Sequence, residues 1–267
     1  MVTNAHDATH GPRLLPAVLT SFAAALVIAG SILALRTEPD GRSTGALFGE
    51  SGLLLGNDPR AFWVWWAIIA CLVVFLVWQW SARGRPSMRL ASIGGPGIVA
   101  GLTQVAWVLS ARAGAIVATV TWLGLGVISL CLVSWRLAKQ RARWLEHLCT
   151  DTGWGLALGF CCVQLLTSAG VVQASLGLSL DEADLVVAIG AYAVLVAAAL
   201  GMAGRLYRQF AVALGLVWGL GWMGWHRFTA EPRSLLLGGT AWLGCLLIVA
   251  GFGASGVRRR ARVQGLE

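Results

Sequence analysis

Charged residues are scarce in this chain: they make up 12% of its 267 residues, whereas an ordinary soluble domain carries about 25%. The hydrophobic share of 57% excludes a disordered chain, and the 34 glycines follow no Gly-X-Y period, which excludes collagen. The length and the placement of the 6 cysteines exclude a small disulfide scaffold. What these absences leave is an integral membrane protein.

The chain also lacks the motifs on which catalysis or metal binding would depend. It has no nucleophile elbow, no phosphate-binding loop and no pair of carboxylates within an apolar run. No Cys-x-x-Cys pair and no Cys/His spacing could close a tetrahedral metal site, so the cysteines are predicted to behave as small hydrophobes. We therefore predict a protein that is not an enzyme and has no metal site.

Long apolar runs are what the chain does contain. A helix needs about 20 apolar residues to cross roughly 30 Å of hydrocarbon, and continuous rather than alternating runs favour helices over a barrel. The sequence predicts an all-α, polytopic transmembrane helix bundle of about eight spans, the first being a retained helix rather than a signal peptide. The spans are Leu14–Leu35, Ala61–Trp80, Ile93–Ala111, Ala115–Trp135, Gly153–Val172, Leu185–Gly204, Phe210–Trp225 and Ser234–Phe252.

The basic residues predict the orientation of the bundle. With an even number of spans both ends of the chain lie on one side, and most of the arginines fall there, in the loops around Arg83–Arg89 and Arg136–Arg143 and in the tail at Arg258–Arg262. The positive-inside rule then predicts a multi-pass protein of the cell membrane with both termini in the cytoplasm. Residues 1–13 form a cytoplasmic leader, 14–252 the transmembrane domain and 253–267 a basic cytoplasmic tail. The net charge of +8 is explained by topology and contact with lipid, so no nucleic-acid partner is predicted.

No Asp, Glu, Lys or Arg lies inside a predicted span away from its ends, which disfavours a proton-coupled pump or an ion channel. The acidic residues beside His147, namely Glu146 and Asp151, are predicted to form a solvated face of a cytoplasmic loop. The glycine pairs Gly97/Gly101, Gly155/Gly159 and Gly215/Gly219 are spaced for close packing of helix backbones.

Tryptophan and neutral polar residues recur on shared helix faces. Trp218, Trp222 and Trp225 follow the i, i+4, i+7 spacing of one face. On the third span Thr103, Gln104 and Trp107 lie along one side. Trp154, Cys161, Gln164 and Ser168 share a face of the fifth span. On the second span Trp63 and Trp66 are predicted to be neighbours, with Trp65 turned away. Polar atoms at this depth need partners, which either helix packing or a ligand cavity would supply.

Several of these segments resemble one family in their order and spacing. Ser43-Thr44-Gly45, then Asp58-Pro59 before Trp63-Val64-Trp65-Trp66, is similar to the tryptophan-rich sensory proteins, bacterial relatives of the translocator protein or peripheral benzodiazepine receptor. The similarity continues in Leu102-Thr103-Gln104-Val105-Ala106-Trp107, in Thr152-Gly153-Trp154 with Gln164, and in Val217-Trp218-Gly219-Leu220-Gly221 ahead of His226. The resemblance implies a translocator-like core at about 14–172 and extra helices at about 185–252, as in longer bacterial members.

The resemblance also implies a ligand. Family members are associated with porphyrins, and some with sterols or stress-linked signalling. Here both expected Asn positions are Gln, the paired prolines are reduced to Pro59, and a Leu-Tyr step is aliphatic, so the identity of the ligand does not carry over. The expected lining of a cavity, for binding rather than catalysis, is Trp63, Trp66, Gln104, Trp107, Trp154 and Gln164.

The leading hypothesis is therefore a non-enzymatic membrane protein that binds a hydrophobic or tetrapyrrole-like small molecule as a sensor or carrier. It needs no cofactor beyond such a porphyrin-type ligand. Its expected partners are the lipid bilayer and that ligand, and a homo-oligomer is compatible with the sequence. The alternatives are a small-molecule transporter and a membrane scaffold or assembly protein.

Overall fold

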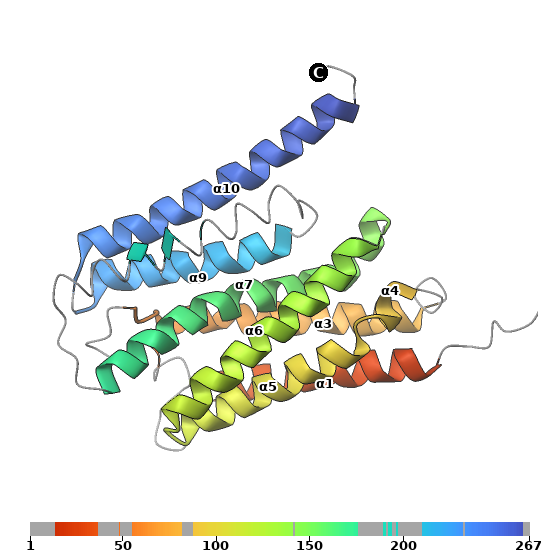
Figure 1. Cartoon of the computed structure of the whole chain (residues 1–267), viewed down its shortest axis with the longest axis horizontal. Helices are drawn as coiled ribbons and strands as arrows, with labels where there is room; N and C mark the ends of the chain where they lie inside the picture. The colour runs from red at the N-terminus through yellow and green to blue at the C-terminus, as the bar shows by residue number, and fades with distance from the viewer. Residues whose placement is uncertain are drawn as a thin grey trace, which may run out of the picture.

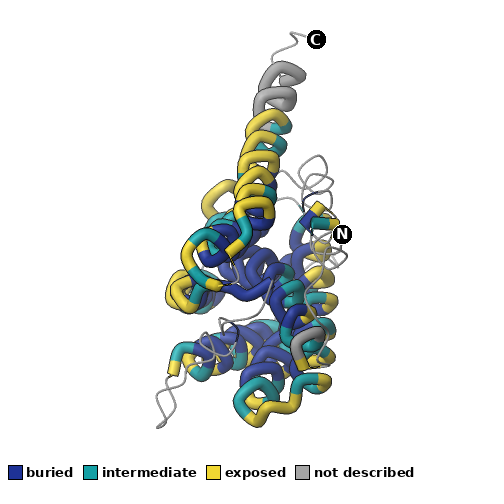
Figure 2. The backbone as a smooth tube through the Cα atoms, turned by 90° about the vertical axis from the view of Figure 1, so that its left-hand side faces the viewer, coloured by how far each residue is buried: buried dark blue, intermediate teal, exposed yellow. Residues whose placement is uncertain are grey.

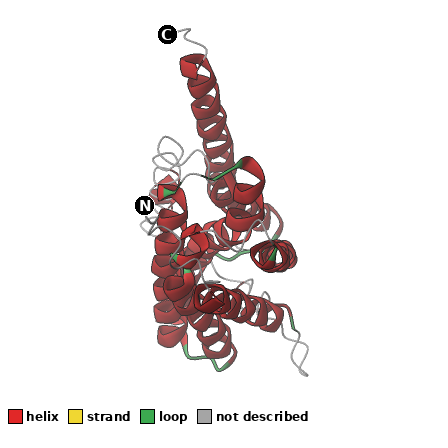
Figure 3. Ribbon diagram, turned by 90° about the vertical axis from the view of Figure 1, so that its right-hand side faces the viewer, coloured by secondary structure: helices red, strands yellow, loops and turns green. Residues whose placement is uncertain are grey.

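The computed structural model of the chain describes residues 14–36, 48, 55–81, 88–140, 142–175, 189–190, 192–193, 196, 210–231 and 233–263. All regular structure in these ranges is helical (Figure 3), which confirms the all-α bundle predicted from the sequence. The elements are α1 (Leu14–Leu35), η1 (Pro59–Trp63), α3 (Val64–Trp80), α4 (Met88–Ala91), α5 (Gly94–Arg112), α6 (Ile116–Lys139), α7 (Trp144–Ser175), α9 (Phe210–Thr229) and α10 (Leu235–Val263).

Five stretches of the described chain are long and apolar enough to cross a membrane. They are α1, η1 together with α3, α6, most of α7 and the first two-thirds of α10. The helices α5 and α9, of 19 and 20 residues, pack lengthwise among these. The predicted span Leu185–Gly204 lies mostly outside the described residues.

The helices α7 and α9 run in the same direction, as their contacts show. A Cβ atom added to Gly155 would touch Ala211, and one added to Gly219 would touch Val163, so the contacts advance together along both helices. The two helices therefore finish at the same end of the bundle.

Two ends of the bundle are useful for placing the sites (Figure 1). Helices α1, α5, α7 and α9 finish at the end where η1 begins, which we call the η1 end. Helices α3 and α6 run the opposite way and finish beside α4, at what we call the α4 end. At the α4 end, Thr20 of α1 donates a hydrogen bond of 2.7 Å to the Gln79 amide oxygen of α3.

The outer surface of the bundle is apolar, as a lipid-facing surface should be. Along α10 the exposed side chains include Leu235, Leu243, Leu246 and Val249. Figure 2 shows many residues along the helix that leads to the C-terminus in the colour of exposed residues. The inner faces are filled by buried aliphatic and aromatic residues from every long helix. The chain is therefore a membrane protein with a packed interior, in which polar groups stand out.

Two helices extend beyond the predicted apolar runs. Helix α7 begins at Trp144 rather than Gly153, and α10 continues to Val263 rather than ending at Phe252. Backbone hydrogen bonding does not depend on apolar side chains, so a helix can continue past the hydrocarbon. As a result, Asp151 lies well inside α7 and not in a loop.

Candidate functional site

A cluster of aromatic rings fills the interior near the η1 end. Phe62 of η1 stacks on Trp107 of α5, with ring centroids 6.5 Å apart, and Trp65 of α3 lies 6.3 Å from the same indole. Phe160 of α7 meets Phe62 and Trp65 edge-on at 5.7 and 5.5 Å. Phe48 stacks on Phe62 and Trp107 at 6.2 and 5.8 Å. We call these five rings the aromatic cluster; all are buried.

Buried polar atoms with no hydrogen-bond partner adjoin these rings. The indole nitrogens of Trp65 and Trp107 are without a partner, as are both side-chain amide atoms of Asn57 and of Gln164. Gln104 on α5 accepts only a weak contact from the Cys161 thiol, at 3.9 Å, and its amide nitrogen has no partner. Native interiors leave few such atoms unpaired, since each costs about 1–3 kcal/mol. Their concentration in one interior region therefore marks a candidate site.

The structure divides the six residues predicted to line a cavity. Gln104, Trp107, Trp154 and Gln164 are buried, with exposed fractions of 6%, 0%, 1% and 0%. Trp63 and Trp66 face outward, at 63% and 61% exposed. The predicted orientation of the second span is therefore wrong, because Trp65, expected to turn away, is the indole that enters the interior.

Trp154 is buried in a different layer of the interior. Its ring meets Phe75 of α3 edge-on at 6.0 Å and lies against Gly97 of α5. It precedes Cys161 by seven residues on α7, which is about 10 Å along a helix axis. Trp154 thus lies closer to the α4 end than the aromatic cluster does. Its indole nitrogen also has no hydrogen-bond partner.

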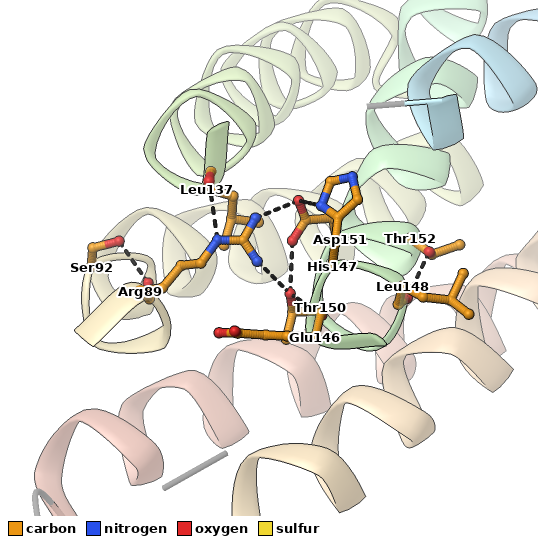
Figure 4. Close-up of polar contacts among 9 residues, drawn as sticks. All are labelled: Arg89, Ser92, Leu137, Glu146, His147, Leu148, Thr150, Asp151 and Thr152. Carbon is orange, nitrogen blue, oxygen red and sulfur yellow. Dashed lines mark hydrogen bonds and ion pairs between the residues drawn. The ribbon is translucent and has the colours of Figure 1, made fainter. Parts of the chain in front are cut away.

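A second polar group, formed by Arg89, Thr150, Asp151 and His147, lies at the α4 end (Figure 4). Arg89 of α4 is 3% exposed and spreads its donors over three acceptors: the Leu137 carbonyl oxygen at 3.1 Å, the Thr150 hydroxyl at 2.8 Å and an Asp151 carboxylate oxygen at 2.6 Å. The same carboxylate oxygen lies 2.6 Å from Nδ1 of His147. We call this group the α4 clamp, since it connects α4, α6 and α7.

The α4 clamp contradicts the sequence prediction that Asp151 lies on a solvated face. Asp151 is 6% exposed, and so does not belong to a solvated face with His147 and Glu146. A charge inside α7 is tolerated because Arg89 neutralises it and Thr150 lies 2.7 Å from its second oxygen. Every named atom of the clamp has a partner, so the clamp is suited to holding helices together rather than to receiving a ligand.

The remaining sequence features are consistent with packing. Among the residues that the structure describes, no group of three or more His, Cys, Asp and Glu side chains could hold a metal ion. Gly97 and Gly101 lie against α1, and Gly155, Gly159, Gly215 and Gly219 lie at the contact of α7 with α9. The predicted use of these glycines for close approach of helices is confirmed.

The fold and the interior are those of an α-helical membrane protein with tryptophan and amide side chains gathered inside its bundle, and five of its described stretches are long and apolar enough to cross a membrane. The family model described as TSPO-like protein matches residues 17–254, so the chain belongs to the TSPO-like family. The resemblance to the tryptophan-rich sensory proteins is thereby confirmed at the level of the family. Neither the curated proteins nor the solved structures gave a match.

Proposed function

We propose that the protein binds a flat, hydrophobic, tetrapyrrole-like molecule in the aromatic cluster, acting as a sensor or carrier and not as an enzyme. The observation that carries this proposal is the set of unpaired polar atoms of Gln104, Gln164, Asn57, Trp65 and Trp107 beside stacked rings. These unpaired atoms destabilise the free protein, and a ligand that forms hydrogen bonds with them would offset that free-energy cost.

The chemistry of these atoms narrows the class of ligand. The two indole nitrogens and the Gln104 amide nitrogen are donors, so they call for acceptors such as carboxylate or carbonyl oxygens. The ring of Phe48 shows that a flat apolar group packs against both Phe62 and Trp107. A planar body with acceptor groups at its edge satisfies both requirements, and porphyrins with carboxylate side chains are one such class.

Replacing Gln104 by leucine is expected to stabilise the free protein while weakening ligand binding. The substitution removes a buried amide whose nitrogen has no partner, which should raise the free energy of unfolding by about 1–3 kcal/mol. The same change removes a donor to the ligand and should lower its affinity about tenfold. Unfolding in mixed detergent micelles and titration with protoporphyrin, followed by quenching of tryptophan fluorescence, measure the two effects.

Two neighbouring tryptophans supply the matched control. Trp65→Phe removes an indole donor from the aromatic cluster, whereas Trp66→Phe changes an outward-facing residue of the same helix. We expect saturable quenching with weakened affinity in the first variant and wild-type affinity in the second. Quenching that rises linearly and is the same in all variants would mean partition of the porphyrin into detergent, and would contradict the proposed function.

A further inference from the structure

A groove lined by tryptophans lies outside the aromatic cluster, between η1, α9 and α10. Its volume is about 440 Å³, and its walls include Trp218, Trp222 and Trp225 of α9 together with Trp242 of α10. The spacing that predicted a shared face for the three α9 tryptophans therefore identified one wall of this groove. Arg60 of η1 is also part of the lining.

The polar edges of two of these indoles are already bound to backbone. Trp218 donates from its ring nitrogen to the Ala61 carbonyl oxygen at 2.8 Å, and Trp242 donates to the Gly221 carbonyl oxygen at 3.2 Å. Trp218 and Trp222 meet edge-on at 5.9 Å. With those donors used, Trp218 and Trp242 offer only apolar surface to whatever enters the groove, which suits an alkyl chain.

Arg60 places a cation at the η1 end of this apolar surface. Its guanidinium carbon lies 5.8 Å from the centre of the Trp222 ring, within the range of a cation–π contact. Its ion pair with Asp58 is long, at 3.9 Å, and its side chain is 58% exposed. The guanidinium therefore has donors available for an anionic oxygen, and guanidinium groups bind phosphate in a two-pronged geometry.

The position of the groove points to the bilayer as the source of its occupant. Leu214, Trp225 and Trp242 are each between two-fifths and about half exposed, on the apolar outer surface that contacts lipid. From Leu214 to Trp225 the groove follows α9 for eleven residues, about 16 Å. One leaflet of a hydrocarbon core is about 15 Å thick, so the groove matches the depth of a single acyl chain.

We propose that this groove binds one anionic phospholipid, with its phosphate at Arg60 and an acyl chain along α9. Arg60 stands at the start of a membrane span, the depth at which headgroups lie and at which long basic side chains reach them. The proposal concerns α9 and α10 and is independent of ligand binding in the aromatic cluster.

Bromine-labelled lipids test this proposal, because bromine on an acyl chain quenches a nearby indole. The protein is placed in phosphatidylcholine nanodiscs that contain a small fraction of brominated phosphatidylglycerol or, in parallel, brominated phosphatidylcholine. We expect phosphatidylglycerol to occupy the groove with about fivefold preference, as one basic residue near anionic lipid provides, and to lose that preference at high salt. Equal quenching by the two lipids at low salt would overturn the proposal.

Variants of two arginines at the η1 end distinguish lipid binding in the groove from general attraction of anionic lipid to basic residues. Arg60→Gln should abolish the preference for phosphatidylglycerol, whereas Arg233→Gln, which changes an exposed arginine outside the groove lining, should retain it. The combined variant Trp222→Phe and Trp225→Phe should reduce the lipid-specific part of the quenching, since two of the four indoles that line the groove are then absent. If the preference for phosphatidylglycerol survives Arg60→Gln, the anionic lipid binds at another site and the proposal is wrong.

A third experiment tests whether the anionic group in the groove belongs to a phospholipid or to a fatty acid. Brominated fatty acid is added to discs of unlabelled phosphatidylcholine with and without unlabelled phosphatidylglycerol. Displacement of the fatty acid by phosphatidylglycerol is expected if the phospholipid is the occupant. A fatty acid that saturates the quenching, depends on Arg60 and resists displacement would overturn the assignment to a phospholipid.

Discussion

Replacing Asp151 by alanine is expected to destabilise the protein by about 3–5 kcal/mol. The substitution leaves Arg89 buried at 3% exposure without its carboxylate partner, and it removes the oxygen that also pairs with His147. The cost arises from the uncompensated charge and not only from a lost contact. A titration with SDS in mixed micelles, followed by far-ultraviolet circular dichroism, gives the change in the free energy of unfolding.

A double substitution distinguishes the effect of an unpaired buried charge from the effect of losing side-chain volume at Asp151. Arg89→Met combined with Asp151→Leu removes both charges and keeps apolar volume, so it should lie much closer to wild type than Asp151→Ala. Glu231→Ala, which removes an exposed acid at 76% exposure, should change stability by no more than about 1 kcal/mol. Loss of less than about 1 kcal/mol in Asp151→Ala would show that the α4 clamp does not hold the helices together.

The apolar spans were predictable from the sequence because the bilayer imposes one length on them. The run Leu14–Leu35 coincides with α1, and the second span differs from Pro59–Trp80 by two residues at its start. Lipid offers no hydrogen bonds, so apolar length and helix length agree wherever the chain crosses the core. They disagree where α7 and α10 continue beyond it, at Trp144 and Val263.

The face of a helix that turns inward was harder to predict. Helix α3 is apolar all round, so periodicity cannot distinguish the face with Trp63 and Trp66 from the face with Trp65. In α9 the three spaced tryptophans are grouped by helix geometry alone, and the prediction of a shared face was correct. Which face is buried depends on the neighbouring helices, and those contacts join residues far apart in the sequence.

The α4 clamp could not have been predicted for the same reason. Arg89 and Asp151 are 62 residues apart, and each separately resembles the charged residues that flank a span. A charge count assigns Arg89 to a loop that determines topology and says nothing about its partner. Only the packing of α4 against α6, and of α6 against α7, brings the two charges to 2.6 Å.

Replacing Gly215 by alanine is expected to separate α7 from α9 and to cost about 3 kcal/mol, the upper end of the range for overpacking. A methyl group there would lie 2.5 Å from the Leu156 carbonyl oxygen and 3.0 Å from the Phe160 backbone nitrogen. These obstacles are backbone atoms, which cannot turn aside as the end of a flexible side chain can. The helices must therefore move apart, and thermal unfolding in detergent should show a lower midpoint.

Gly221→Ala is the matched control on the same helix, because nothing lies within 4 Å of a Cβ added there. That variant should be as stable as wild type or slightly more so, since alanine favours a helix over glycine by about 0.5–1 kcal/mol. Similar behaviour of both variants would show that the close contact contributes little. The backbone of Phe160 lies against Gly215, and its ring contacts Phe62 and Trp65. Separation of α7 from α9 should therefore weaken porphyrin binding as well. The glycine contact then fixes the geometry of the aromatic cluster from outside it.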